Sequence, residues 1–286
     1  MDKEKVFDEQ WWFKDNINKI PSDYYDEDSL FHYTTNESCI EILKSETLNG
    51  YQRKNSSDPF EGKSIIVSDQ VYSSSDSEYE QIINSTNDEV CKIKKDLKVK
   101  LKESFQVSFC VNDLKNGELG FLKPRMWERY GDKFKGVCLV FSKKQLMEEN
   151  KNIDEKGLVN YLFYSQFNPL NFEIRRNQID KTKETYLTEI NKKITTKLFS
   201  KHNDFKGENE FKIVLYSTNK LSNLNIRKSL KGVIISLESE QLNTKNIKSF
   251  CDENKKHFHF IHWNERGVKV LDKNHFNVPK IKISNI

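Results

Sequence analysis

The chain has 286 residues, 36% of them hydrophobic, and a formal net charge of +4. This length is ample for a hydrophobic core, and so small a charge does not by itself indicate a nucleic-acid partner. The five cysteines follow no CxxC or CxH spacing and are odd in number, which argues against a zinc site and a disulfide framework. No apolar run approaches the roughly 18 residues of a membrane helix, so we expect a cytoplasmic protein with no membrane partner.

Residues 1–27 are acidic and aromatic and contain Trp11 and Trp12. We expect a short segment docked on the rest of the chain by its tryptophans. The alternative is an arm that binds a partner, such as an inhibitory protein. Residues 28–286 show no repeat and no low-complexity linker, so we predict a single domain.

The hydrophobic periodicity predicts a first strand over residues 30–35 and a helix over residues 36–47, with Thr34 and Glu37 as a capping box. Residues 52–62 are expected to be a polar loop. Further helices are predicted over residues 79–102, 124–131, 180–199 and 241–251, and further strands over residues 105–110, 136–141, 158–164, 211–216, 232–237, 258–263 and 267–271. Strands outnumber helices and do not alternate with them, which favours an α+β fold with mixed, mostly antiparallel sheets and flanking helices.

The sequence has no glycine-rich phosphate loop, no GxSxG elbow and no HExxH helix. The remaining candidates for chemistry are polar and aromatic residues near the ends of predicted strands. They are His32, Tyr33, Thr34, Arg53, Asp58, Glu61, Ser108, Trp127, Arg129, Tyr130, Glu208 and Glu210.

Glu208 and Glu210 stand where a turn enters a predicted strand. Residues two apart in a strand project from the same face, which would place the two carboxylates roughly 6 to 7 Å apart. Such a pair can divide the work of stabilising a cationic centre and moving a proton. The alternative is a solvated acidic turn.

His32 lies in an otherwise apolar strand, where a histidine is more often a hydrogen-bonded core residue than a ligand. In a strand, however, it shares a face with Thr34. The helix that follows also brings backbone donors and a partial positive charge that suit a phosphate or a carboxylate.

Several motifs together resemble a widespread bacterial family catalogued as a domain of unknown function. The family's consensus elements are HYTS, NDPFE, SFS, MWxxYG followed by KG, and ENEYR. In this chain the corresponding runs are LFHYTT with ILKSETL, then NSSDPFE, VSFC, MWERYGDKFKGVCLVF and GENEFKIV, in the same order over roughly residues 30–270. Lys212 stands where the family has an arginine.

The chain also resembles the ADP-ribosyltransferase superfamily. A histidine in an opening strand, followed by Tyr or Thr and a helix, is similar to the DNA-targeting ADP-ribosyltransferase toxins, and Glu208 with Glu210 is similar to the ExE element. The resemblance implies a transferase-like fold that uses NAD as its substrate. Cleavage of the nicotinamide glycosidic bond creates an oxocarbenium-like centre, which a carboxylate can stabilise.

This second resemblance also implies residue roles. Glu210 would be the main catalytic carboxylate, and Glu208 would orient or deprotonate the acceptor. His32, with Tyr33 and Thr34 beside it, would hold the ribose or the amide of NAD.

The same resemblance gives four further residues a part. Arg53 would pair with the pyrophosphate and Ser108 would support the main carboxylate. Trp127 or Tyr130 would stack on the nicotinamide ring, although core packing is an equal alternative for Trp127. The MWERYG run itself is not a usual transferase signature.

The first functional hypothesis is therefore an NAD-dependent ADP-ribosyltransferase or NAD glycohydrolase, acting as an intracellular bacterial toxin or anti-phage defence effector. Its target would be a nucleic acid, a protein or a small molecule. The second hypothesis is a non-catalytic sensor that binds a nucleotide or phage component in the same pocket. The third is a metal-dependent nuclease built on Asp58, Glu61, Glu208 and Glu210.

Overall fold

The computed structural model describes residues 19–56, 58, 61, 67–68, 103–163, 170–171, 192, 195–216, 223–265 and 267–272. Trp11 and Trp12 lie outside these residues. So do the helix predicted over residues 79–102 and most of the helix predicted over residues 180–199.

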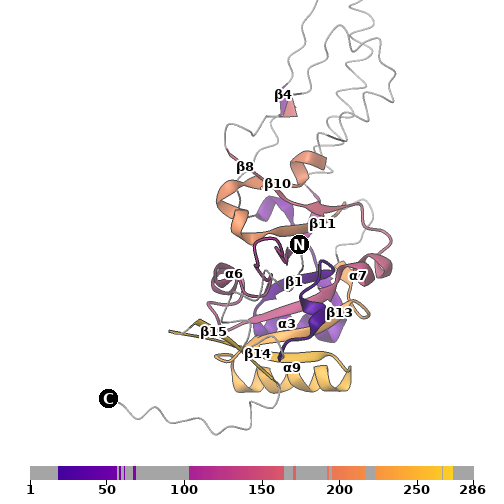
Figure 1. Ribbon diagram of the computed structural model, residues 1–286. Helices are drawn as coiled ribbons and strands as arrows, with labels where there is room; N and C mark the ends of the chain where they lie inside the picture. Colours follow the sequence, from indigo (N-terminus) through magenta and orange to yellow (C-terminus); the bar gives the residue numbers. More distant parts are fainter. Residues whose placement is uncertain are drawn as a thin grey trace, which may run out of the picture.

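A nine-stranded sheet forms the centre of the molecule (Figure 1). Its main path runs β15-β14-β13-β6-β1-β5-β11-β7, and β3 pairs separately with β5. The strands are β1 (Ser29–Thr34), β3 (Tyr51–Gln52), β5 (Phe105–Val111), β6 (Val137–Ser142), β7 (Glu155–Leu158), β11 (Glu210–Leu215), β13 (Leu230–Ser236), β14 (His257–Asn264) and β15 (Gly267–Asp272).

The pairing within this sheet is antiparallel except between β13 and β14. Short two-stranded pairs accompany it: β2 (Thr47–Asn49) with β12 (Asn223–Asn225), β8 (Asn160–Leu162) with β10 (Ser200–His202), and β4 (Val67–Ser68) with β9 (Leu170–Asn171). The predicted α+β class with a mixed, mostly antiparallel sheet is confirmed.

Helices pack on both faces of the sheet. On one face lie α3 (Asn36–Ser45), α7 (Lys143–Glu149) and α9 (Gln241–Glu253), which cover a core that includes Leu139 and Phe141. Figure 1 shows α3 and α9 together beneath the sheet. The other face carries α6 (Pro124–Arg129) and a second core around Trp127 and Val140. None of the described helices is long and apolar enough to cross a membrane.

Three 3-10 helices are also described: η2 (Ser22–Tyr24), η3 (Arg53–Asn55) and η6 (Asn203–Glu208). The buried Tyr24 of η2 belongs to the second core, and its backbone carbonyl accepts a 2.9 Å hydrogen bond from Asn112 Nδ2. The described end of the N-terminal segment therefore packs against the domain.

Three local predictions need correction. Thr35, not Thr34, caps α3, because its Oγ1 accepts a 3.2 Å hydrogen bond from the Ser38 amide. Helix α7 was not predicted; the Ser142 hydroxyl caps it at the end of a strand. The strand predicted over residues 158–164 is two strands, because the chain leaves β11 after Leu158 and pairs with β10 from Asn160 onward.

A tight left-handed turn connects α6 to β6. Asp132, Lys133 and Phe134 all have positive φ angles, of 47°, 51° and 67°. A side chain at Gly136 would overlap the carbonyl oxygen of Thr34, so this glycine lets the turn lie against the end of β1. The turn fixes the position of α6 above the sheet.

Candidate functional site

A cavity of about 390 Å³ lies against β1, β5 and β11 beneath α6. Its walls include the polar residues Tyr51, Asn55 and Lys201, together with apolar groups such as Phe31 and Met126. Six of the residues predicted from the sequence also line it: His32, Tyr33, Ser108, Tyr130, Glu208 and Glu210.

His32 marks the point where β1 and β5 separate. The two strands pair through Leu30 and Phe31, whereas β1 follows β6 over its whole length. Beyond this point the His32 Nδ1 lies 3.0 Å from the backbone carbonyl oxygen of Ser108. A side-chain hydrogen bond thus links the strands where backbone pairing ends, and one wall of the cavity forms there.

The His32 hydrogen bond also determines the form of the ring. Burial lowers the pKa of His32 below its ordinary value, and the bond to the Ser108 carbonyl offsets only part of this effect. Because a carbonyl can only accept, Nδ1 carries the proton of the neutral ring. Nε2 is then the acceptor that remains for a ligand.

Glu208 and Glu210 meet, but not in the way the spacing predicted. Glu208 ends η6, Asn209 has a left-handed backbone with φ of 45°, and Glu210 begins β11. Lys201 joins the two carboxylates, since its Nζ lies 2.8 Å from Oε2 of each. The glutamates are only 2% and 3% exposed, so a solvated acidic turn is ruled out.

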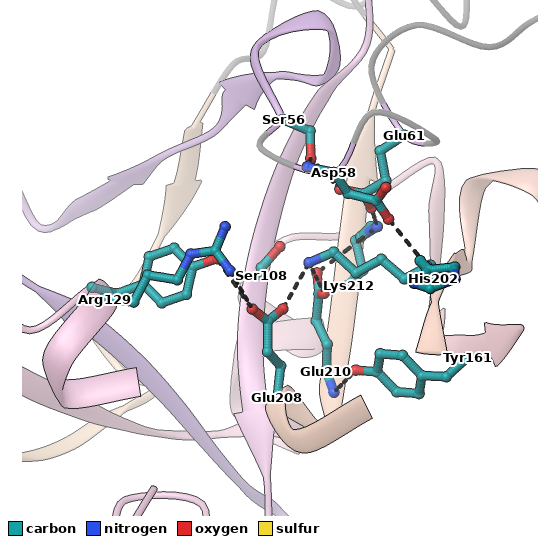
Figure 2. A network of polar contacts seen from close by, with 12 residues as sticks. Ser56, Asp58, Glu61, Ser108, Arg129, Tyr161, His202, Glu208, Glu210 and Lys212 are labelled. Carbon is teal, nitrogen blue, oxygen red and sulfur yellow. Dashed lines mark hydrogen bonds and ion pairs between the residues drawn. The ribbon is translucent and has the colours of Figure 1, made fainter. Parts of the chain in front are cut away.

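A second ion pair lies beside the first (Figure 2). Lys212 Nζ donates to Glu61, lies 3.8 Å from Glu210 Oε1, and donates to the Leu198 carbonyl at 3.3 Å. Ser56 Oγ donates to the other oxygen of Glu61. Figure 2 shows Glu61 and Asp58 on one side of this network and the Glu208–Glu210 pair on the other.

The two glutamates of the cavity have different surroundings. Glu208 Oε1 accepts a 3.2 Å hydrogen bond from the Tyr130 hydroxyl and lies 3.8 Å from Arg129 Nη1. Glu210 Oε1, by contrast, accepts no hydrogen bond from any part of the chain that the structure describes. Glu208 is therefore held by donors at both oxygens, whereas Oε1 of Glu210 has the Lys212 ammonium near it at 3.8 Å but accepts no hydrogen bond from the described residues.

The charges of this network support one another. Burial alone would lower the pKa of Lys201, but Glu210, Glu61 and Glu208 together raise it above its ordinary value. Burial would likewise raise the pKa of Glu61, but Lys212 and Lys201 hold it below its ordinary value. Lys201 and Glu61 are therefore charged at neutral pH.

Three of the nine residues that were given a part in NAD binding or cleavage do not line the cavity. Trp127 is fully buried, and its Nε1 donates to the Phe121 carbonyl at 2.8 Å, so it packs in the core. Arg53 is 2% exposed, and its Nη2 lies 3.5 Å from the Lys197 carbonyl oxygen. Thr34 is also absent from the cavity wall.

Sequence reasoning missed three residues of the site. The Tyr51 hydroxyl lies 3.3 Å from Ser108 Oγ and accepts a 2.8 Å bond from Gln106. The Tyr161 hydroxyl accepts a 2.9 Å bond from the Glu210 amide. Lys201 is one of 47 basic residues, and no motif distinguishes it from the others.

The ammonium groups bear on the nuclease hypothesis. Within the described ranges, no group of three or more His, Cys, Asp or Glu side chains is arranged to hold a metal ion. Glu210 and Lys212 do have the ExK spacing of some nucleases, but Lys212 is fully buried against Glu61. A divalent cation at these carboxylates would have to compete with two lysines.

One family model matches part of the chain. Residues 126–213 match the family described as "Protein of unknown function (DUF2971)". This stretch contains the last four residues of α6, Lys201 and the Glu208–Glu210 pair, and the match supports the predicted resemblance to a bacterial family of unknown function. Searches of the curated proteins and of the solved structures found no match.

Proposed function

We propose that this protein cleaves the bond between nicotinamide and ribose in NAD, as an ADP-ribosyltransferase or an NAD glycohydrolase. The observation that carries the proposal is the convergence of His32, Ser108 and Glu210, from three adjacent strands, on one cavity with aromatic walls. Its volume of about 390 Å³ lies within the range of small-ligand pockets.

Glu210 fits the demands of this reaction. When the glycosidic bond breaks, its electron pair leaves with nicotinamide and neutralises the pyridinium, while positive charge develops at the ribose C1′. Oε1 of Glu210, which accepts no hydrogen bond from the described residues, would stabilise that charge and accept a hydrogen bond from the neighbouring ribose hydroxyl. Water or a heteroatom of the target then bonds to C1′ and releases its proton to solvent or to Glu208.

The remaining lining residues would hold the substrate. Nε2 of His32 would accept a hydrogen bond from a ribose hydroxyl or the carboxamide. Tyr33, Tyr51 and Tyr130 offer rings to the flat cationic nicotinamide. Arg53 and Trp127 have no direct role in this proposal, because neither reaches the cavity.

The second candidate is a sensor that binds a nucleotide without turnover. Lys201 favours it, because its ammonium contacts the oxygens of Glu208 and Glu210 and offsets part of the negative charge that the cleavage reaction would use. A metal-dependent nuclease is the third candidate, resting on the ExK spacing of Glu210 and Lys212. For the first candidate, we extend the proposal to an intracellular toxin or an anti-phage effector that depletes NAD or modifies a target.

The test is incubation of the purified protein with NAD, followed by chromatography of nicotinamide and ADP-ribose. Release of both in equal amounts supports a glycohydrolase, and ADP-ribose retained on added nucleic acid or protein supports a transferase. NAD binding in calorimetry without turnover on any target favours the sensor. Cleavage of nucleic acid that requires Mg²⁺ or Mn²⁺ but not NAD would overturn the proposal in favour of the nuclease.

A further inference from the structure

Lys201 occupies a position that the proposed chemistry does not explain. It lies in the middle of β10, is 4% exposed and lines the cavity. Its Nζ donates to Glu208 and Glu210 at the same distance of 2.8 Å. The side chain also passes over the Phe205 ring, whose centroid is 5.2 Å from Nζ, and this contact limits its movement.

Two carboxylates so placed do not both stay ionised without compensation. In a buried site, repulsion between like charges drives one of them to take up a proton. A protonated Glu210 would be a poor stabiliser of a cationic centre, because its negative charge would be lost. An ammonium between the two groups removes this difficulty.

The ammonium also fixes the orientation of the Glu210 carboxylate. Oε2 is bonded to Lys201, while Oε1 accepts no hydrogen bond from the described residues and lies 3.8 Å from Lys212 Nζ. Holding Oε2 fixes the rotation of the carboxylate and leaves Oε1 without a hydrogen bond of its own from these residues. The same ammonium offsets part of the negative potential of Glu210. Lys201 therefore fixes the orientation and the ionised state of this carboxylate but weakens the electrostatic field that it exerts on a ligand.

We propose that Lys201 is a positioning residue that keeps Glu208 and Glu210 ionised and side by side at neutral pH. The proposal rests on the proposed function for its catalytic meaning. The charged and titratable groups that surround the three residues are Tyr51, Glu61, Arg129, Tyr130, Tyr161 and Lys212. Among these, Lys212 pairs with Glu61 and Arg129 is partly exposed, so neither replaces the ammonium of Lys201.

The first experiment compares kcat against pH for the wild type, Lys201→Met and Lys201→Arg with NAD as substrate. In Lys201→Met one carboxylate keeps a proton until a higher pH. The acid limb of the profile therefore shifts to higher pH by about one pH unit or more. Activity then falls about tenfold at pH 6 and recovers toward pH 9. Lys201→Arg retains the charge and keeps the acid limb of the wild type.

A loss of activity by the same factor at every pH would overturn the proposal, because packing alone would then explain it. An unchanged profile in Lys201→Met would overturn it as well. Thermal melting of each variant at pH 6 and pH 9 separates unfolding from an effect at the site.

A second measurement does not depend on NAD turnover. Carboxyl ¹³C NMR of glutamate-labelled protein, with Glu210→Gln to identify the signal, follows proton uptake at Glu210. In Lys201→Met, proton uptake by the Glu208–Glu210 pair begins at a higher pH than in the wild type. The double variant Lys201→Met with Glu208→Gln removes one carboxylate with the ammonium, so the Glu210 titration returns toward that of the wild type.

The two measurements separate the two proposals. If the wild type releases no nicotinamide while the NMR titration shifts as expected, the proposed function fails and the role of Lys201 stands. If nicotinamide is released and the titration does not shift in Lys201→Met, the role of Lys201 is wrong. If Lys201→Met does not fold, the double variant and Lys201→Arg carry the test, and a titration of Glu210 that differs between Lys201→Arg and the wild type overturns the proposal.

Discussion

Strands β6 and β11 are both six residues long and buried along their whole length, yet they serve different purposes. On one face both contribute apolar residues to the same core, Leu139 from β6 and Ile213 from β11. On the other face β6 continues with Val140, whereas β11 presents Glu210 and Lys212. The two strands therefore share one core on the first face, whereas on the other face the core around Val140 gives way to the charged site at β11.

The buried ion pairs of β11 are expected to stabilise the fold less than the apolar packing of β6 does. Burying an ion pair gains little over apolar packing, but breaking one partner away from it is costly. We therefore expect β11 to tolerate paired changes better than single ones and β6 to respond mainly to lost volume. Variants of Lys212 and Glu210 on β11 and of Leu139 on β6 test this difference, and a variant of His32 extends the test to β1.

The largest expected effect is that of Lys212→Met. It leaves Glu61 buried without its ammonium partner, which should lower the free energy of unfolding by about 3–5 kcal/mol. Urea unfolding followed by circular dichroism measures the change. Adding Glu61→Gln to this variant should restore most of the loss, and a single variant as stable as the wild type would show that the ion pair has no structural weight.

Glu210→Gln should separate activity from stability. We expect nicotinamide release to fall by about 10²- to 10³-fold, because the charge that stabilises the transition state is lost. The fold persists because Lys201 keeps Glu208 as its partner at 2.8 Å and is not left unpaired. Leu139→Ala on β6 is the matched control. It should lower stability by about 2–5 kcal/mol through a core cavity and leave turnover per folded molecule unchanged. Full activity in Glu210→Gln with an intact Tm would contradict the assignment.

The smallest effect is expected for His32→Ala. Loss of the Nδ1 bond to Ser108 and of the Nε2 acceptor should raise KM for NAD about tenfold with a smaller change in kcat. Steady-state kinetics give both values. His32→Asn keeps a donor toward the Ser108 carbonyl and should recover part of the binding; equal KM values in all three proteins would remove His32 from the substrate contacts.

The sequence predicted elements well where a periodic pattern continues for several residues. Strand β5 shows this, since Val107 and Phe109 alternate with polar residues and pack in the core as expected. Helix α7 was missed because its seven residues are mostly polar and follow a strand without a break. In the site, the prediction that Glu208 and Glu210 project from the same face of one strand was wrong. Asn209 has a left-handed backbone, and Glu208 therefore lies outside the strand.

Contacts between separate elements were beyond prediction for a different reason. Lys201 is only seven and nine residues from the carboxylates, but η6, which lies between them, carries no hydrophobic period that would predict their contact. Arg53 looked like a ligand contact because it stands in a polar loop, but the loop folds inward and buries its guanidinium. Local patterns specify which residues are polar, whereas the packing of separate segments decides which of them meet a cavity.

The order of strands in the sheet also has a consequence for how the molecule assembles. Strands β13, β14 and β15, with α9 between the first two, lie within residues 230–272, so their contacts close short loops. The site instead joins His32 to Ser108 across 76 residues and Glu61 to Lys212 across 151. Because contacts between distant residues form slowly, we expect the C-terminal unit to gain hydrogen-exchange protection early in refolding. The cavity, and any activity it supports, should be the last feature to return.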